Sequence, residues 1–161
     1  FPGAGGAKED PHIASPGTTA SWSRHDLEPF RVLIAEGRAP AVMTGLSGHE
    51  TGQGDRQAAA LSRAVVTGLL RDDMGFEGLA LTDDLDMGAS GGGRNRRTVV
   101  RQAIRAGNDL LMIRNVHSHD PDLPGKLAAW VEASLSAGEV SAADLRRAVE
   151  RVRAFRLRRA G

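Results

Sequence analysis

The sequence predicts an α/β fold in which short parallel strands alternate with helices. Three short runs, at residues 39–44, 78–82 and 109–113, are almost wholly apolar. Between them, apolar residues recur at the three- and four-residue spacing of amphipathic helices. Strands without a polar side are typical of a parallel sheet covered by helices, and we therefore expect that architecture.

The first part of the chain is expected to contain a loop, a helix, a strand and a second loop. Phe1 to Ala20 is rich in glycine and proline and shows no period. Ser23 can cap a helix that ends at Gly37. The run Ala39–Thr44 is then predicted as a buried strand, and the polar, glycine-rich residues 47–57 as a loop.

The middle of the chain continues the alternation. Apolar spacing from Ala58 to Leu69 predicts one helix, and Gly78–Thr82 predicts the next strand. The glycine-rich residues 90–93 are expected to form a loop. A third helix is predicted over Thr98–Ala106, where Gly107 ends it.

The last part of the chain predicts one strand and two closing helices. The strand covers Asp109–Ile113, and the helices cover Leu127–Ala137 and Ala142 to about Arg159, the second with Ser141 as its N-cap. Most arginines of the last helix fall outside its apolar positions. We interpret them as a solvated basic face rather than a nucleic-acid site.

Composition excludes several classes of protein. The chain has 161 residues, room for about one domain, with 40% hydrophobic and 25% charged residues. A net charge of +1 gives no bulk electrostatic attraction for nucleic acid, so no nucleic-acid partner is expected. No apolar run reaches the roughly 18 residues that span a membrane. The chain contains no cysteine, which excludes disulfides, thiol chemistry and cysteine-ligated zinc.

The strongest signal for chemistry is a group of three carboxylates, Asp83, Asp84 and Asp86, at the end of a predicted buried strand. Like charges this close repel one another, and a strand end gives them little solvent. One of them could serve as a nucleophile, base or metal ligand. The alternative is a strand-to-helix junction that uses aspartate to cap the helix.

Histidines supply a second signal. In Asp10-Pro11-His12 a carboxylate lies beside an imidazole, an arrangement that can fix the tautomer and produce an acid/base group near neutrality. The alternative is a turn-forming surface loop. His49 follows a predicted strand and could line a site, whereas His117 and His119 are expected in a polar loop.

These pieces resemble glycoside hydrolase family 3, and within it the β-N-acetylglucosaminidases that trim cell-wall fragments. Asp10-Pro11-His12 matches the Asp-x-His dyad that distinguishes those enzymes within the family. The matching segments occur in family order over nearly the whole chain: Phe1–Gly5, Asp10–His12, Leu27–Phe30, Ala41–Thr44, Ala60–Ser62, Leu69–Arg71, Gly75–Gly78, Thr82–Leu85 and Ala106–Leu111.

The resemblance implies a (β/α)8 barrel and a retaining mechanism with a covalent intermediate. It makes Asp83 the nucleophile and His12, oriented by Asp10, the acid/base group, with no cofactor and no metal. Asp84 and Asp86 are expected to support the site. The residues expected to contact the carbohydrate substrate are Gly3, Gly5, Met43, His49 and Asp84. Leu46 stands where the family usually has a histidine, and His49 is expected to replace that contact.

A barrel of this type needs about 250 residues. Residues 1–161 are therefore expected to form one segment, the C-terminal portion of the catalytic domain with its last three strands. An isolated three-stranded sheet would leave a bare edge and uncovered apolar side chains. The segment is expected to need the preceding part of the barrel as its partner and to have little activity alone.

Three other functions remain open at this point. A phosphorylase of the same family would transfer the sugar to phosphate instead of water. A remnant without catalysis would only bind sugar or serve as a scaffold. A phosphatase of the haloacid dehalogenase type would use Asp84 and Asp86 in an Asp-x-Asp motif with Mg²⁺, although Met87 follows where that motif normally has glycine.

Overall fold

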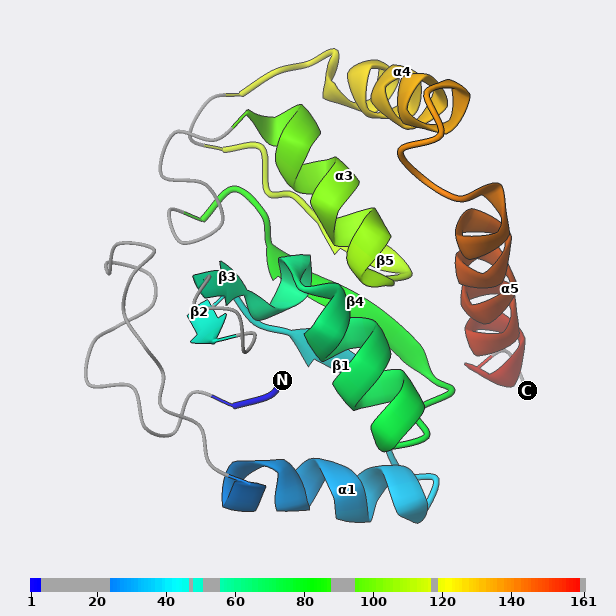
Figure 1. Cartoon of the computed structure of the whole chain (residues 1–161). Coiled ribbons are helices and arrows are strands. Elements are labelled where there is room, and N and C mark those ends of the chain that lie inside the picture. The colour runs from blue at the N-terminus through cyan, green and yellow to red at the C-terminus, as the bar shows by residue number, and fades with distance from the viewer. Residues whose placement is uncertain (4–23, 47, 51–55, 88–94, 117–118, 160–161) are drawn as a thin grey trace.

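The computed structural model describes residues 1–3, 24–46, 48–50, 56–87, 95–116 and 119–159. Its centre is a three-stranded sheet in the order β1-β4-β5, formed by Ala41–Thr44, Leu79–Asp84 and Leu110–Met112. Both pairs are parallel, with Val42 opposite Ala80 and Leu81 opposite Leu110. The predicted parallel α/β fold is confirmed (Figure 1).

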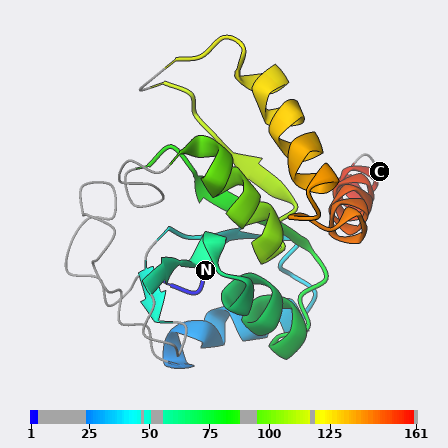
Figure 2. The same ribbon diagram turned by 45° about the horizontal axis from the view of Figure 1, so that its top comes forward.

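Helices follow the strands as the alternation predicts. A 3-10 turn at Arg24–Leu27 leads into α1, Glu28–Ala35, and a π-helix, η3, spans Ala64–Asp73. Figure 2 shows η3 beside α3, Arg96–Ala106, with α4, Leu123–Ser136, and α5, Ala142–Arg159, beyond them.

Local capping explains why two of these helices begin or end where the sequence predicts. The side chain of Asn95 accepts a hydrogen bond from the N–H of Arg97, and Gly107 ends α3 with a φ of 106°. The hydroxyl of Ser141 accepts hydrogen bonds from the N–H groups of Ala143 and Asp144. These caps satisfy backbone groups that a helix end leaves without partners.

Two expectations about residues 47–69 are wrong. The predicted loop contains an antiparallel hairpin, β2 at Gly48–Glu50 and β3 at Arg56–Ala58, whose strands are too short and polar to show a period. The predicted single helix from Ala58 is interrupted, with a 3-10 turn, η2, at Ala59–Leu61 before η3. Ser62, between the two, has extended backbone angles, φ −98° and ψ 115°, which a continuous helix would not contain.

The core lies between the sheet and the helices that cover its outer face. Val42 and Ala80 of the sheet pack against Val66 and Leu70 of η3. A buried hydrogen-bond network also connects the elements. The Thr44 hydroxyl lies 2.7 Å from Asn108 Oδ1, and Asn108 Nδ2 donates to the carbonyls of Ala60 and Ala103. Because each partner is satisfied, the network links β1, η2 and α3 without a buried orphan.

The inner face of the sheet is uncovered in the part of the chain that the structure describes. Met43, Leu110 and Met112 are 45%, 42% and 36% exposed there. Phe1 extends the sheet beside β1, since its amino group donates to the Met43 carbonyl and its own carbonyl accepts from the N–H of Gly45. The sheet is thus one sector of a barrel wall, open toward the inside. None of the described helices is long and apolar enough to cross a membrane.

Candidate active site

The acidic cluster lies at the carboxyl end of the central strand. Asp83 and Asp84 are the last residues of β4, and Asp86 follows them. In barrels of parallel strands, this end of the sheet is where catalytic groups are placed. The geometry around each carboxylate shows how the chain accommodates three negative charges in four residues.

Asp84 is buried and fully bonded. It is 3% exposed, and its Oδ1 accepts from the N–H groups of Asp86 and Arg114 at 3.1 and 3.0 Å, while its Oδ2 pairs with the Arg114 guanidinium. Burial raises the pKa of the Asp84 carboxyl, but these donors outweigh burial and hold the pKa below its usual range. The expected sugar contact of Asp84 stays a prediction, and its bonds favour a supporting role beneath Asp83.

Asp86 is paired with a different arginine. Arg96, at the start of α3, binds both of its carboxylate oxygens, at 2.8 and 2.9 Å. The N–H of Asn115 donates to the same carboxylate at 2.8 Å. Asp86 therefore joins the end of β4, the first turn of α3 and the segment after β5.

Asp83 differs from its two neighbours because no arginine among the described residues pairs with it. Its Oδ1 accepts the N–H of Asp84 at 2.7 Å. Burial alternates along β4, so that Asp83 follows Leu81 on the inner face, opposite to the buried Thr82 and Asp84. Its carboxylate also acts on the Phe1 amino group, whose pKa burial lowers to about 6 against the opposing attraction of Asp83. Among the described residues, Asp83 is thus the carboxylate of the cluster that lies on the inner face of the sheet without an arginine partner.

The structure places some of the other predicted residues near this edge. Met43 lies on the inner face of β1, and Gly3, two residues after Phe1, has a φ of 135° that favours glycine. His49 lies in β2, where its backbone pairs with Gln57. Asp10, His12 and Gly5 lie outside the described residues, so the expected dyad stays a prediction.

Leu46 explains how the chain departs from the family pattern. Its side chain is 3% exposed and packs with Ala58, Leu61 and Leu85 in a core cluster. A histidine at this position would be buried among apolar groups. Leu46 is therefore an apolar anchor for the segment after β1, and the expected loss of a sugar contact at this position stays a prediction.

The arrangement does not fit the Asp-x-Asp phosphatase. That mechanism needs Asp84 and Asp86 as ligands of Mg²⁺, but arginine and backbone N–H groups already occupy both carboxylates. Hard cations prefer free oxygen ligands, and a guanidinium on each ligand opposes a second positive charge. No group of three potential metal-ligating side chains occurs among the described residues.

Sequence reasoning missed the three residues that divide the cluster, namely Arg96, Arg114 and Asn115. Asn115 also bonds Asp120 and adopts a φ of 55°. A usable signal was present in the arginine directly after the third strand, because parallel strands bring their carboxyl ends together. His119, expected in a polar loop, lies with its Nδ1 at 3.3 Å from the Asn115 carbonyl.

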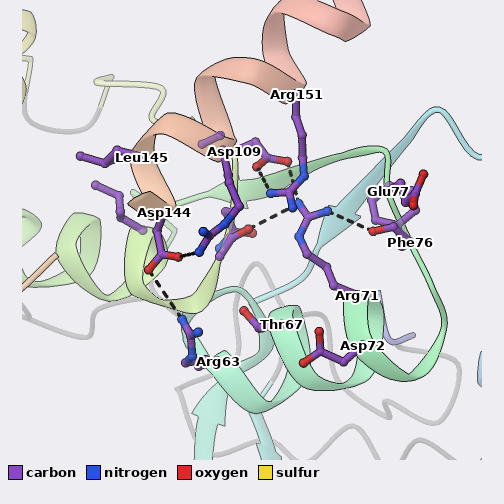
Figure 3. A pocket seen from close by; sticks show the side chains of 15 residues that line it. Arg63, Thr67, Arg71, Asp72, Phe76, Glu77, Asp109, Asp144, Leu145 and Arg151 are labelled. Carbon is purple, nitrogen blue, oxygen red and sulfur yellow. Dashed lines mark hydrogen bonds and ion pairs between the residues drawn. The ribbon is translucent and has the colours of Figure 1, made fainter. Parts of the chain in front are cut away.

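A cavity of about 490 Å³ lies away from the acidic cluster, between η3 and α5 (Figure 3). At its wall the carboxylate of Asp109, 1% exposed, accepts from Arg71 at 2.7 Å and from Arg151 at 3.2 Å. Arg63 and Arg147 both approach Asp144 there. The ion pairs of Asp109 with Arg151 and of Asp144 with Arg63 connect α5 to the rest of the fold at this cavity.

Comparison with known proteins agrees with this geometry. Residues 1–155 match the model of the glycosyl hydrolase family 3 N-terminal domain. A beta-hexosaminidase of Tolumonas auensis is 37% identical over 120 residues, which cover 71% of this chain and 35% of that relative. The chain spans about a third of the length of the curated relatives it matches.

Two solved structures are similar over almost the whole chain. A family 3 β-N-acetylglucosaminidase of Paenibacillus sp. str. FPU-7 has a TM-score of 0.82 at 32% identity and covers 99% of this chain and 30% of its own. A family 3 glycosyl hydrolase of Mycobacterium smegmatis has a TM-score of 0.76 at 32% identity and covers 96% of this chain and 47% of its own. The open sheet, its inward-facing aspartate and these matches lead to one conclusion: the chain belongs to glycosyl hydrolase family 3.

Proposed function

We propose that residues 1–161 are the C-terminal portion of the catalytic barrel of a retaining glycosidase that removes terminal β-N-acetylglucosamine from cell-wall fragments. The observation that carries this proposal is the division of the acidic cluster. Arginines neutralise Asp84 and Asp86, and Asp83 is left facing the barrel interior. The names of the similar beta-hexosaminidases and of the Paenibacillus enzyme support the choice of sugar.

In this proposal Asp83 is the nucleophile. Its carboxylate attacks the anomeric carbon while the bond from that carbon to the leaving oxygen breaks, and His12 gives its proton to that oxygen. In the second step His12 accepts a proton from water, the water oxygen bonds to the anomeric carbon, and Asp83 leaves as a carboxylate. Asp10 orients the imidazole and favours its protonated form.

The residues proposed to contact the sugar are Gly3, Gly5, Met43 and His49. Gly3 and Gly5 let the backbone approach the substrate, and Met43 offers an apolar surface on the inner face of β1. His49 is proposed to supply the contact that Leu46 lacks. Asp84 and Asp86 hold the end of β4 and the segments around it.

The partner of this segment is the remainder of the barrel. Parallel sheets are normally covered on both faces, and the inner face here exposes Met43, Leu110 and Met112. We therefore propose that the segment acts only when further strands complete the wall and enclose the sugar.

The test compares the chain alone with a completed barrel. The chain is joined behind the first two thirds of the Tolumonas auensis beta-hexosaminidase, and release of a chromogenic β-N-acetylglucosaminide is measured. We expect release by the joined protein and none by residues 1–161 alone. Asp83→Asn should reduce turnover by at least about a thousandfold, because the amide is a poor nucleophile.

Asp73→Asn, an exposed aspartate at the end of η3, is the matched control and should leave turnover unchanged. Unchanged turnover in Asp83→Asn would refute the assignment of the nucleophile. Formation of a sugar 1-phosphate in phosphate buffer would identify a phosphorylase. A joined protein that folds and binds N-acetylglucosamine without releasing the chromophore would identify a sugar-binding remnant.

A further inference from the structure

The hydrogen-bond register between β4 and β5 shifts between Leu81 and Asp84, the stretch of β4 that contains Asp83. Leu81 lies opposite Leu110, and Asp84 lies opposite Met112. β4 therefore advances three residues while β5 advances two, so β4 carries one extra residue at Thr82–Asp83. Such a bulge bends its strand and re-aims a side chain, and bulges are frequent beside active sites.

Two buried side chains hold this bulge from the face opposite to Asp83. The Thr82 hydroxyl, 0% exposed, accepts the N–H of Met112 at 3.0 Å. Asp84 Oδ1 accepts the N–H of Arg114, two residues after the end of β5, at 3.0 Å. The residues on either side of Asp83 thus each use a side-chain oxygen to bind backbone, Thr82 at the end of β5 and Asp84 in the segment that follows it.

We propose that Thr82 and Asp84 form a brace that fixes the direction of the Asp83 carboxylate, and that Thr82 is a positioning residue for the reaction. The brace binds Thr82 to Met112 of β5 and Asp84 to Arg114 just after β5, so the backbone of Asp83 between them has little freedom. Asp83 is then directed to the inner face, and its Oδ1 is held by the N–H of Asp84. The extra residue in β4 is what allows the side chains of Thr82 and Asp84 to reach β5. This inference deepens the proposed function and rests on Asp83 as its nucleophile.

The first experiment measures the brace in residues 1–161 by NMR, without any need for turnover. The variants are Thr82→Val, which removes the hydroxyl and keeps the shape, and Thr82→Ser, which keeps the hydroxyl. Thr67→Val is the matched control, because the Thr67 hydroxyl donates to the Ala106 carbonyl at 2.7 Å, a bond between η3 and α3 that involves neither β4 nor β5. The readouts are the exchange rate of the Met112 amide and the carboxyl carbon resonance of Asp83.

In Thr82→Val we expect the Met112 amide to exchange roughly five- to tenfold faster, the effect of losing one hydrogen bond, and the Asp83 resonance to move. Thr82→Ser should restore both signals, and Thr67→Val should leave both near wild type. If Thr82→Val does not fold, Thr82→Ala takes its place against Thr82→Ser, because both lack the methyl group. Equal signals in the hydroxyl-bearing and hydroxyl-free variants would overturn the brace.

The second experiment separates this inference from the proposed function. In the joined protein described above, Thr82→Val should lower kcat by about ten- to a hundredfold with little change in KM, and Thr82→Ser should recover most of the loss. If Asp83→Asn keeps full turnover, the nucleophile assignment fails, and the NMR result still decides the brace. If Asp83→Asn is inactive while Thr82→Val turns over as fast as Thr67→Val, Thr82 does not position the nucleophile.

Discussion

The two ends of the central sheet treat buried aspartates in different ways. At the amino end, Asp109 receives two arginines, Arg71 and Arg151, and the N–H of Ala80. At the carboxyl end, Asp84 and Asp86 receive one arginine each, and Asp83 receives none among the described residues. The aspartate at the amino end is thus paired with two guanidinium groups, whereas Asp83 at the carboxyl end has no arginine partner in the described part of the chain.

The contrast indicates that the aspartate at the amino end stabilises the fold, whereas Asp83 at the carboxyl end is available for chemistry. A carboxylate with two guanidinium partners is a poor nucleophile and a firm anchor, because each bond lowers the energy of its charged form. A carboxylate without such partners beside two others costs stability, and the chain limits that cost by pairing the neighbours. Functional groups commonly carry a cost of this kind, whereas the amino end of a barrel sheet serves stability.

The largest predicted effect is on the amino end. Asp109→Ala should lower the free energy of unfolding by about 3–5 kcal/mol, because it leaves Arg71 buried without its ion partner. Asp83→Asn should change it by less than about 0.5 kcal/mol or should stabilise the chain, since it removes a like charge from the cluster. Urea unfolding of residues 1–161 followed by circular dichroism measures both.

If Asp83→Asn were as destabilising as Asp109→Ala, the two ends would not differ in role. Asp73→Asn, at an exposed position, serves as the control for the loss of an aspartate charge.

The elements of the fold could be predicted where their cause is local. The strand at Ala41–Thr44 lies within its predicted range because an apolar run between Pro40 and Gly45 needs no other information. The caps at Ser141 and Gly107 are equally local. The break after Leu61 could not be predicted, because it lies at the extended backbone of Ser62, where the sequence has neither glycine nor proline.

The candidate site shows the same limit. The sequence locates the acidic cluster at a strand end, but it does not show which carboxylate remains unpaired. That division depends on Arg114, thirty residues after Asp84, and on Arg96 at the start of another helix. The bulge at Thr82–Asp83 also depends on a neighbouring strand and has no local signature.

The next largest predicted effect on stability concerns Asp84 and its dependence on pH. Its pKa is lowered in the folded chain, so the unfolded chain binds more protons in acid, and stability falls as the pH falls. The contribution should be complete above about pH 4, the ordinary aspartate pKa, and be lost as the pH drops through the lowered value. Asp84→Asn should lower stability at pH 7 by about 1.5–3 kcal/mol and make the acid limb of the curve shallower.

Urea midpoints between pH 2.5 and 7 measure this effect, with Asp83→Asn as the matched variant in the adjacent position. Equal acid limbs in wild type and Asp84→Asn would contradict the lowered pKa. The pairing of Asp84 with Arg114 would then have no energetic role at the carboxyl end.

The smallest predicted effects compare two arginines of α5. Arg151→Ala should cost about 1 kcal/mol, because Asp109 keeps Arg71 and the lost partner is only partly exposed. Arg147→Ala should cost less than about 0.5 kcal/mol, since its pair with Asp144 is largely open to solvent. Unfolding in urea at low and at 1 M salt distinguishes them, because screening should remove the Arg147 contribution and leave most of that of Arg151. If both substitutions lowered the free energy of unfolding equally, and both effects disappeared at 1 M salt, the Arg151–Asp109 pair would behave as a surface ion pair. It would then stabilise the amino end of the sheet less than its geometry indicates.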